Sequence, residues 1–189
     1  SFLTVTDGKC HDINIVRDLK YGFPALQPDS IIAVDRAYID FEWFSSLDKK
    51  GITFVTRAKD NFDYMPAGQH KANKNKGIIS DTSVMLGGFY SFQTFQSELR
   101  LIKYKDKESG KTLSFLTNNF KLAASTIAAI YKARWQIELF FKWIKQNLKI
   151  KTYLGTSENA VLTQIWVAMI YYLMLAFIKF QTKYSFSLL

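Results

Sequence analysis

The sequence is poor in the residues that build disulfide frameworks, soft-metal sites and disordered linkers. Of its 189 residues only one is a cysteine, Cys10, and only three are prolines. A single thiol can form neither an internal disulfide nor a zinc site with several thiolates, which fits a reducing compartment. Because 48% of the residues are hydrophobic and 16% aromatic, the composition excludes a disordered chain. It predicts a globular protein with one well-buried core, with or without an inserted subdomain.

The first residues also lack a secretory signal, since Ser1 to Lys9 has no basic start followed by an apolar run and a cleavage site. We therefore expect a cytoplasmic protein. The chain has no initiator Met, and Phe2 to Thr6 reads as a strand already under way. This pattern predicts that the chain begins in the middle of a fold.

Charge of one sign is in excess. Lysine and arginine outnumber the acids 25 to 16, which gives a formal net charge of +9 and a pI of about 9.5. Such an excess favours a nucleic acid or an anionic membrane surface as partner. Part of it lies in a predicted basic loop over residues 69–76, within a stretch from 60 to 78 that contains Pro66 and Gly68.

Residues 159–178 contain no charged side chain and are numerous enough to span a bilayer. Thr163, Gln164, Tyr171 and Tyr172 place polar atoms in this run. A helix that is apolar all round can equally be the central helix of a soluble core. We favour the core helix and expect no membrane partner.

The first third of the chain has the pattern of an α/β fold. Residues 31–34 and 52–56 are short apolar runs typical of buried strands, and 40–50 reads as a helix closed by Gly51. Strand, helix and strand with tight connections predict parallel pairing. Residues 78–118 are rich in β-formers and include a predicted hairpin of 99–104 with 112–117. We therefore expect an antiparallel insert over residues 60–118.

From Lys121 to about Lys151 the period becomes helical, with no Gly or Pro. On a wheel of about 100° per residue, an acid, a phenol and two cations share an arc of roughly 60° beside the apolar face: Tyr131, Arg134, Glu138 and Lys145. An ordinary solvated helix edge, with Arg134 and Glu138 as an i, i+4 ion pair, would look the same.

The spacing of these four residues is Tyr-x2-Arg-x3-Glu-x6-Lys, and it resembles the Y-R-E-K signature of DDE transposases of the insertion-sequence-four group. Asp35-Arg-Ala-Tyr38 resembles the second-aspartate motif of that family. Phe54 to Lys59 and Phe115 to Asn118 are similar to family segments on either side of its β-rich insert. The resemblance covers most of the chain in the family's order.

The resemblance implies a ribonuclease-H-like core over residues 1–59 and 119–189, with the insert at 60–118. It implies that Asp35 and Glu138 are the second and third catalytic acids and metal ligands, holding two Mg²⁺ (or Mn²⁺) ions. Tyr131, Arg134 and Lys145 would bind phosphates beside the cut, and Arg57 and Lys59 would add DNA affinity. The implied partner is double-stranded DNA at transposon terminal repeats, in a nucleoid-associated protein that could form a homodimer.

The sequence departs from the family pattern at its first acid. The family's first Asp precedes the segment that corresponds to Thr6 through Asp12, so we expect that Asp and two strands upstream of Ser1, and we expect this chain to be inactive alone. Asp7, His11 and Asp12 fit turn and capping roles better than a ligand role.

Three other interpretations stay open from the sequence. One is a remnant that only binds DNA, through Arg57, Lys59 and three loop lysines, Lys71, Lys74 and Lys76. Another is a basic membrane-associated protein with residues 159–178 in lipid. The third is a nuclease of the same fold that cuts DNA without joining strands.

Overall fold

The computed structural model describes residues 26–147 and 157–183. The chain divides at Arg134 into two compact units. The sheet unit is described over 26–134 and the helix unit over 135–147 and 157–183, and each is treated by itself. The predicted strand at 1–6, the predicted helix at 12–21, and Asp7, His11 and Asp12 lie outside the described residues.

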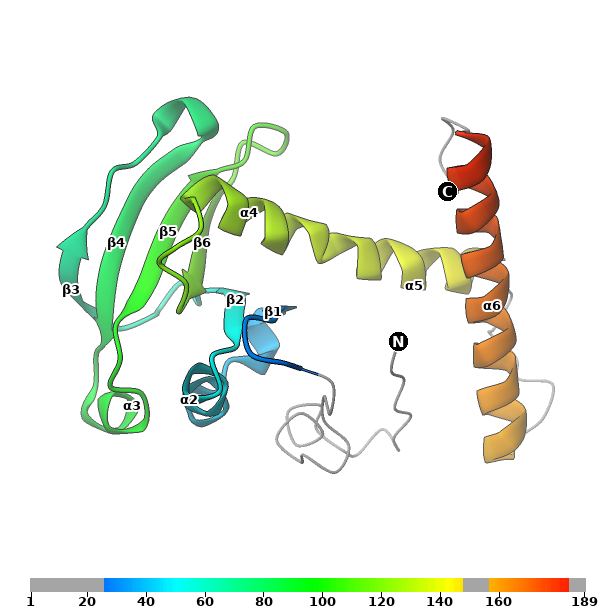
Figure 1. Ribbon diagram of the computed structural model, residues 1–189, viewed down its shortest axis with the longest axis horizontal. Helices are drawn as coiled ribbons and strands as arrows, with labels where there is room; N and C mark the ends of the chain where they lie inside the picture. The colour runs from blue at the N-terminus through cyan, green and yellow to red at the C-terminus, as the bar shows by residue number, and fades with distance from the viewer. Residues whose placement is uncertain (1–25, 148–156, 184–189) are drawn as a thin grey trace. The chain divides into compact units, whose positions relative to one another are not determined.

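The sheet unit is built on a six-stranded mixed sheet in the order β1-β2-β6-β5-β4-β3 (Figure 1). As the sequence predicts, β1 (Ile31–Val34) pairs in parallel with β2 (Thr53–Arg57), and the helix α2 (Phe41–Lys49) connects the two strands along the chain. The predicted hairpin is also present, as β5 (Leu99–Lys105) and β6 (Thr112–Thr117). Because β6 pairs antiparallel with β2, the antiparallel strands continue the sheet that the parallel pair begins.

Both faces of this sheet are covered, which explains why its central strands bury pairs of consecutive apolar residues. Phe54, Leu101 and Leu116 face a cluster formed with α2. Their neighbours Val55, Ile102 and Phe115 face a second cluster formed with α4 (Ala124–Ala133). Successive strand residues point to opposite faces, so a helix on each side buries both sets. The sheet unit is therefore a mixed α/β structure.

Helix α2 shows how local sequence sets these bounds. The carboxylate of Asp40 accepts a hydrogen bond from the Trp43 N–H at 2.8 Å and caps the helix. Gly51, with φ of 69°, ends the helical segment in a conformation that a side chain would disfavour. Trp43, Phe44 and Leu47 are buried between these ends.

A strand that was not predicted precedes the basic loop expected at residues 69–76. Tyr64–Gln69 forms strand β3, which pairs antiparallel with β4 (Ile78–Leu86). Proline is tolerated there because β3 is an edge strand, and the register shifts between Pro66 and Gly68. The predicted basic loop is irregular from His70 onward and contains a short 3-10 turn, η2, at Lys74–Lys76. A short helix in the β-rich stretch, α3 (Phe89–Thr94), was also not predicted.

The single helix predicted from Lys121 is divided in two. Helix α4 ends at Ala133 and α5 covers Trp135–Asn147. Arg134, between them, keeps right-handed helical dihedrals (φ −55°, ψ −31°), but its N–H bonds to the Tyr131 carbonyl three residues back. Such a bond tightens the turn and interrupts the α-helical hydrogen-bond pattern at Arg134. The spacing of apolar residues in the sequence continues across this point, and for that reason it predicted one helix.

In the helix unit, α5 packs against α6 (Glu158–Thr182) through aromatic side chains. Phe140 and Trp143 contact the Tyr172 ring with centroids 4.8 and 5.2 Å away. The expectation that α6 is buried all round is not met, because this contact covers one face and leaves apolar residues such as Val167 and Phe177 exposed. By length and composition, Asn159–Thr182 is the one described helix that could cross a membrane, a test that core helices also pass.

Candidate active site at the ends of the parallel strands

Asp35 follows β1 directly, and its carboxylate is held in place by the backbone of the next turn. Its Oδ1 accepts a hydrogen bond from the Ala37 N–H at 3.0 Å. Its carbonyl accepts one from the Tyr38 N–H, also at 3.0 Å, which closes the 3-10 turn η1 (Arg36–Tyr38). With Oδ1 engaged, the second oxygen, Oδ2, is the one directed away from the turn. The Asp-x-small-aromatic motif thus sets the orientation of one acid.

That second oxygen faces Arg134. The distance from Arg134 Nη2 to Asp35 Oδ2 is 3.4 Å, with the arginine side chain 14% exposed and the aspartate 39%. The guanidinium carbon also lies 5.3 Å from the centre of the Tyr131 ring, within cation–π range. Asp35 therefore forms one cluster with Tyr131 and Arg134, which lie 96 and 99 residues further along the chain.

Tyr131 anchors the cluster to the core. Its ring is buried and lies 5.0 Å from that of Phe115 on β6. Burial raises the pKa of Tyr131 above its ordinary value of 10, the positive charge of Arg134 opposes this, and the negative charge of Asp35 adds to it. The phenol is therefore protonated at neutral pH and can donate a hydrogen bond.

Arg57 ends β2 beside this group, opposite Phe115 in the antiparallel register. Val34 pairs with Thr56, so Arg57 and Asp35 each follow a paired residue at the same end of the parallel strands. The positive charge of Arg57 also acts to lower the pKa of Tyr131. Lys59 is exposed two residues further on. Within the described residues no hydrogen bond or ion pair joins Lys59 to Asp35 or Arg134. The structure thus groups Arg57 with the cluster and leaves Lys59 at the surface.

Glu138 and Lys145, the other two residues of the signature, lie on α5 in the helix unit. Glu138 is half-buried and borders an open hollow of about 550 Å³ with Phe141, Lys142 and Gln146. The side chain of Lys145 lies outside the described set. Glu138 and Asp35 belong to different units of the chain, and their approach to each other stays a prediction.

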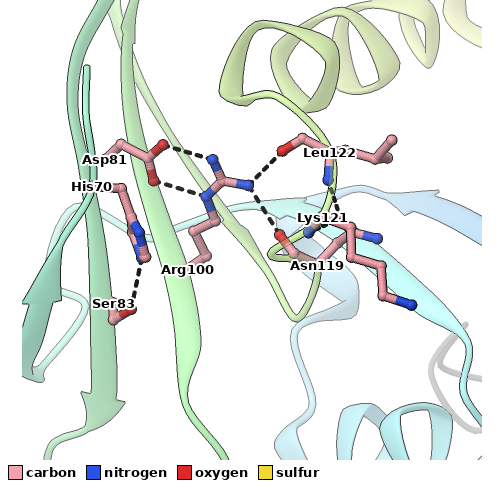
Figure 2. Close-up of polar contacts among 7 residues, drawn as sticks. All are labelled: His70, Asp81, Ser83, Arg100, Asn119, Lys121 and Leu122. Atoms are coloured by element: carbon pink, nitrogen blue, oxygen red, sulfur yellow. Dashed lines mark hydrogen bonds and ion pairs between the residues drawn. The ribbon is translucent and has the colours of Figure 1, made fainter.

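Sequence reasoning missed the arginine that fixes the start of α4. Arg100 on β5 forms a bidentate pair with Asp81 on β4, at 2.8 and 2.6 Å, and its other terminal nitrogen donates to the carbonyls of Asn119 and Leu122 (Figure 2). Both side chains are buried. Strand β5 also contains Lys103 and Lys105, so the only local signal was that Arg100 stands between Leu99 and Leu101, where a buried arginine needs an acidic partner.

The segment between β6 and α4 is held in place by two asparagines, Asn118 and Asn119. Asn118 donates to the Asp48 carboxylate and the Ile52 carbonyl, while its Oδ1 accepts from the Phe54 N–H. Asn119 Oδ1 accepts from the N–H groups of Lys121 and Leu122 at 3.0 and 2.8 Å (Figure 2). Since α4 begins directly after this segment, these bonds set the position from which it carries Tyr131.

The donors present suit a hard divalent cation in type. Carboxylate oxygens are the ligands that Mg²⁺ and Mn²⁺ prefer, and Asp35 offers Oδ2 at a half-exposed strand end. Among the described residues, however, no three His, Cys, Asp or Glu side chains gather into a metal-binding group. Among the described residues of the sheet unit, Asp35 could supply one carboxylate to such a site.

Comparison with known proteins identifies the family. Residues 2–174 match the family described as Transposase DDE domain, which covers both strands of the parallel pair, the cluster around Asp35 and helices α4 and α5. The chain belongs to the DDE transposase family. This confirms the resemblance drawn from the Y-R-E-K spacing, and members of the family generally use divalent metal ions.

Individual relatives agree with this assignment. The chain is 35% identical over 177 residues to a Sinorhizobium fredii protein named as transposase y4zB, and the match covers 92% of this chain and 48% of that protein. It is 33% identical over 155 residues to a Geobacillus stearothermophilus protein named as a transposase for insertion sequence element IS5377, covering 81% and 40%. A Synechocystis protein named for element IS4SA is 32% identical over 162 residues, covering 84% and 45%. The chain spans about half the length of these relatives.

Proposed function

We propose that this chain is the part of an insertion-sequence transposase that carries two of its catalytic acids, Asp35 and Glu138, on a ribonuclease-H-like core. The observation that supports this most is the position of Asp35, which lies at the end of a parallel strand and faces Arg134 of the Y-R-E-K signature at 3.4 Å. The reaction is cleavage of a DNA phosphodiester at a terminal repeat, followed by strand transfer.

In this proposal Asp35 and Glu138 hold the divalent cations, Mg²⁺ or Mn²⁺. Two such ions, when bound, activate the attacking oxygen and stabilise the leaving one. The Ala37 N–H keeps Asp35 Oδ1 engaged, so Oδ2 is the oxygen available to a cation. A carboxylate held in one orientation loses less freedom on binding than a mobile one.

Arg134 has two successive roles in this account. Without DNA it partly neutralises Asp35, and with DNA it turns to a phosphate oxygen beside the cut, where a guanidinium can bind two oxygens at once. The Tyr131 ring beneath it limits where the guanidinium can go, and the Tyr131 phenol, kept protonated by burial, can donate to a second phosphate oxygen. Arg57 and Lys145 supply further positive charge along the bound DNA strand.

DNA binding tests the phosphate-binding roles. Arg134→Ala and Lys145→Ala should each weaken binding to duplexes that carry the element's ends more than Lys50→Ala does, because Lys50 ends α2 away from the cluster. Affinity should also fall steeply with salt, since phosphate contacts release counterions. Fluorescence anisotropy at several salt concentrations measures both. Equal losses in all three variants would mean that the signature is an ordinary helix face.

Two rival functions share the DNA-binding step and differ in chemistry. A remnant that only binds DNA would show no Mg²⁺-dependent nicking of terminal-repeat DNA even when the chain is joined to the rest of its transposase. A ribonuclease-H-like nuclease would nick that DNA but would join no strands in a strand-transfer assay. We favour the transposase because the family match extends through the whole Y-R-E-K segment.

A membrane-associated protein is the third rival, because α6 is apolar and long enough to span a bilayer. Flotation with liposomes separates the two functions. The transposase should remain with the soluble fraction, as expected for a cytoplasmic, nucleoid-associated protein that forms a homodimer on DNA. Comigration with neutral phospholipid vesicles at high salt would favour insertion of α6.

A further inference from the structure

Two turns rich in lysine meet at one end of the six-stranded sheet. One is the β3–β4 connection, which contains η2, and the other is the β5–β6 turn at residues 106–111; Figure 1 shows both at the same end of the sheet. They are joined by the Lys105 N–H, which donates to the Gly77 carbonyl at 2.8 Å. A Cβ on Gly77 would lie 2.8 Å from the Lys105 carbonyl oxygen. Glycine therefore allows the close approach of the two turns.

Between the turns lies an open hollow of about 380 Å³. Three lysines, Lys74, Lys105 and Lys107, line it and are exposed. Gly77 and Gly110 border it without side chains, which leaves room for a ligand to approach the backbone. We call this feature the lysine hollow.

The acid in the lysine hollow is already paired. Asp106 accepts hydrogen bonds from Lys132 Nζ at 2.8 Å and from the Ser109 hydroxyl at 2.7 Å. These contacts hold the pKa of Asp106 at about 2, so it remains an anion whose charge is offset by Lys132 on α4. In the described part of the chain none of the three lining lysines forms an ion pair, and their positive charge faces solvent.

The lysine hollow lies at the same end of the sheet as the catalytic cluster. Strand β2 ends at Arg57, which pairs with Phe115 of β6. Strand β6 begins at Thr112, three residues before Phe115, and the β5–β6 turn directly precedes it. The turn therefore lies beyond the end of β2 that carries Arg57. With residues about 3.4 Å apart along a strand and strands about 4.8 Å apart, the hollow is on the order of 15 Å from Arg57. Duplex DNA rises 3.4 Å per base pair on each strand, so this is about four to five base pairs.

We propose that the lysine hollow is a second DNA-binding site, which takes backbone phosphates of the same duplex about four to five base pairs from the scissile bond. The proposal rests on the proposed function, because it assumes that the cluster around Asp35 binds the cut. Lysine ammonium groups are compact point charges that attract phosphate without reading the base sequence. The site therefore adds affinity and fixes the direction of the duplex, and takes no part in the chemistry.

The test uses the full 189-residue chain and a 30-base-pair duplex containing a terminal repeat. Lys74, Lys105 and Lys107 are changed together to Gln, and the matched control changes Lys49, Lys50 and Lys121 to Gln. The control lysines are exposed and adjoin the opposite end of β2. Both triple variants lose three charges, so diffuse attraction to DNA falls equally in each. Circular dichroism checks that all proteins are folded.

We expect the hollow variant to bind at least ten-fold more weakly at 100 mM salt than the control variant. We also expect its slope of log affinity against log salt to be smaller by about two to three, since each phosphate contact contributes about 0.9. Shortening the duplex so that it ends two base pairs beyond the cut should remove this difference. Equal losses in the two variants, or no loss in either, would overturn the proposal while leaving the proposed function intact. Absence of DNA binding by the unmodified chain at low salt would overturn both.

Discussion

Arg134 and Asp35 are paired with each other, with Nη2 of the arginine 3.4 Å from Oδ2 of the aspartate. In the proposed function each has a different ligand, a DNA phosphate for Arg134 and a divalent cation for Asp35. A cation on Asp35 frees Arg134, and a phosphate on Arg134 frees Asp35. Binding of metal and binding of DNA should therefore favour each other, and by linkage the coupling is the same in both directions.

Removing Arg134 should therefore raise metal affinity in the absence of DNA. A partly exposed ion pair contributes roughly 0.2–1 kcal/mol, so Arg134→Gln should strengthen Mn²⁺ binding by up to about five-fold while weakening DNA binding. Titration calorimetry with MnCl₂ measures the first effect. Arg36→Gln is the matched control, since Arg36 is the exposed neighbour of Asp35. Unchanged or weaker Mn²⁺ binding by Arg134→Gln would show that the pair does not compete with the cation.

Loss of Arg100 should destabilise the sheet unit more than loss of any exposed lysine. Arg100→Met leaves Asp81 buried without its partner and frees the carbonyls of Asn119 and Leu122. Breaking such a buried pair costs about 3–5 kcal/mol, measurable by urea unfolding. Lys103→Met on the same strand should cost little. The double variant Arg100→Met, Asp81→Leu should recover much of the loss, and a double variant no more stable than Arg100→Met would contradict this reading.

The Asp106–Lys132 pair predicts a specific dependence on acid. The pKa of Asp106 is lowered from 3.8 to about 2 in the folded protein, chiefly by its hydrogen bonds from Lys132 and Ser109. Its contribution to stability is thus present above about pH 4 and is lost as the pH falls through 2. Asp106→Asn should be less stable than the unmodified protein at pH 7, and the difference should shrink toward pH 2. Glu108→Gln, at an exposed position, should change unfolding little at either pH, whereas a difference for Asp106→Asn that is independent of pH would refute the assignment.

Local patterns in the sequence predicted the elements that depend on local causes. The apolar run Ile31–Val34, the helix from Asp40 and the hairpin of β5 with β6 each have their signal within a few residues. The Asp35 motif and the Y-R-E-K spacing also identified the residues that the structure gathers, namely Asp35 with Tyr131 and Arg134.

Elements that depend on distant contacts were missed. Strand β3 contains Pro66 and Gly68 and forms because β4 offers it an edge. Arg100 is buried in β5 because Asp81 and the backbone before α4 surround its guanidinium, and none of these partners is closer than nineteen residues in sequence. Which faces of α6 are buried also depends on other parts of the chain, and the absence of charge in residues 159–178 does not determine it.

The 189-residue chain should cut no DNA by itself. Phosphodiester cleavage by two cations needs ligands that hold both ions, and the described residues offer no group of three acids. Incubation with terminal-repeat DNA and Mg²⁺ or Mn²⁺ should therefore yield no nicked product on a denaturing gel. Metal-dependent nicking that is abolished by Asp7→Ala would show instead that Asp7 supplies the missing carboxylate.

The central claim is that Asp35 and Glu138 hold the same divalent cations. Iron-directed cleavage tests it most directly, because Fe²⁺ bound in place of Mg²⁺ generates hydroxyl radicals, with ascorbate and peroxide, that cut the nearby polypeptide. We expect fragments that end near residue 35 and near residue 138, suppressed by excess Mg²⁺ and lost at both positions in Asp35→Asn and in Glu138→Gln. Cleavage near only one of the two residues, or cleavage that persists in both variants, would contradict the account.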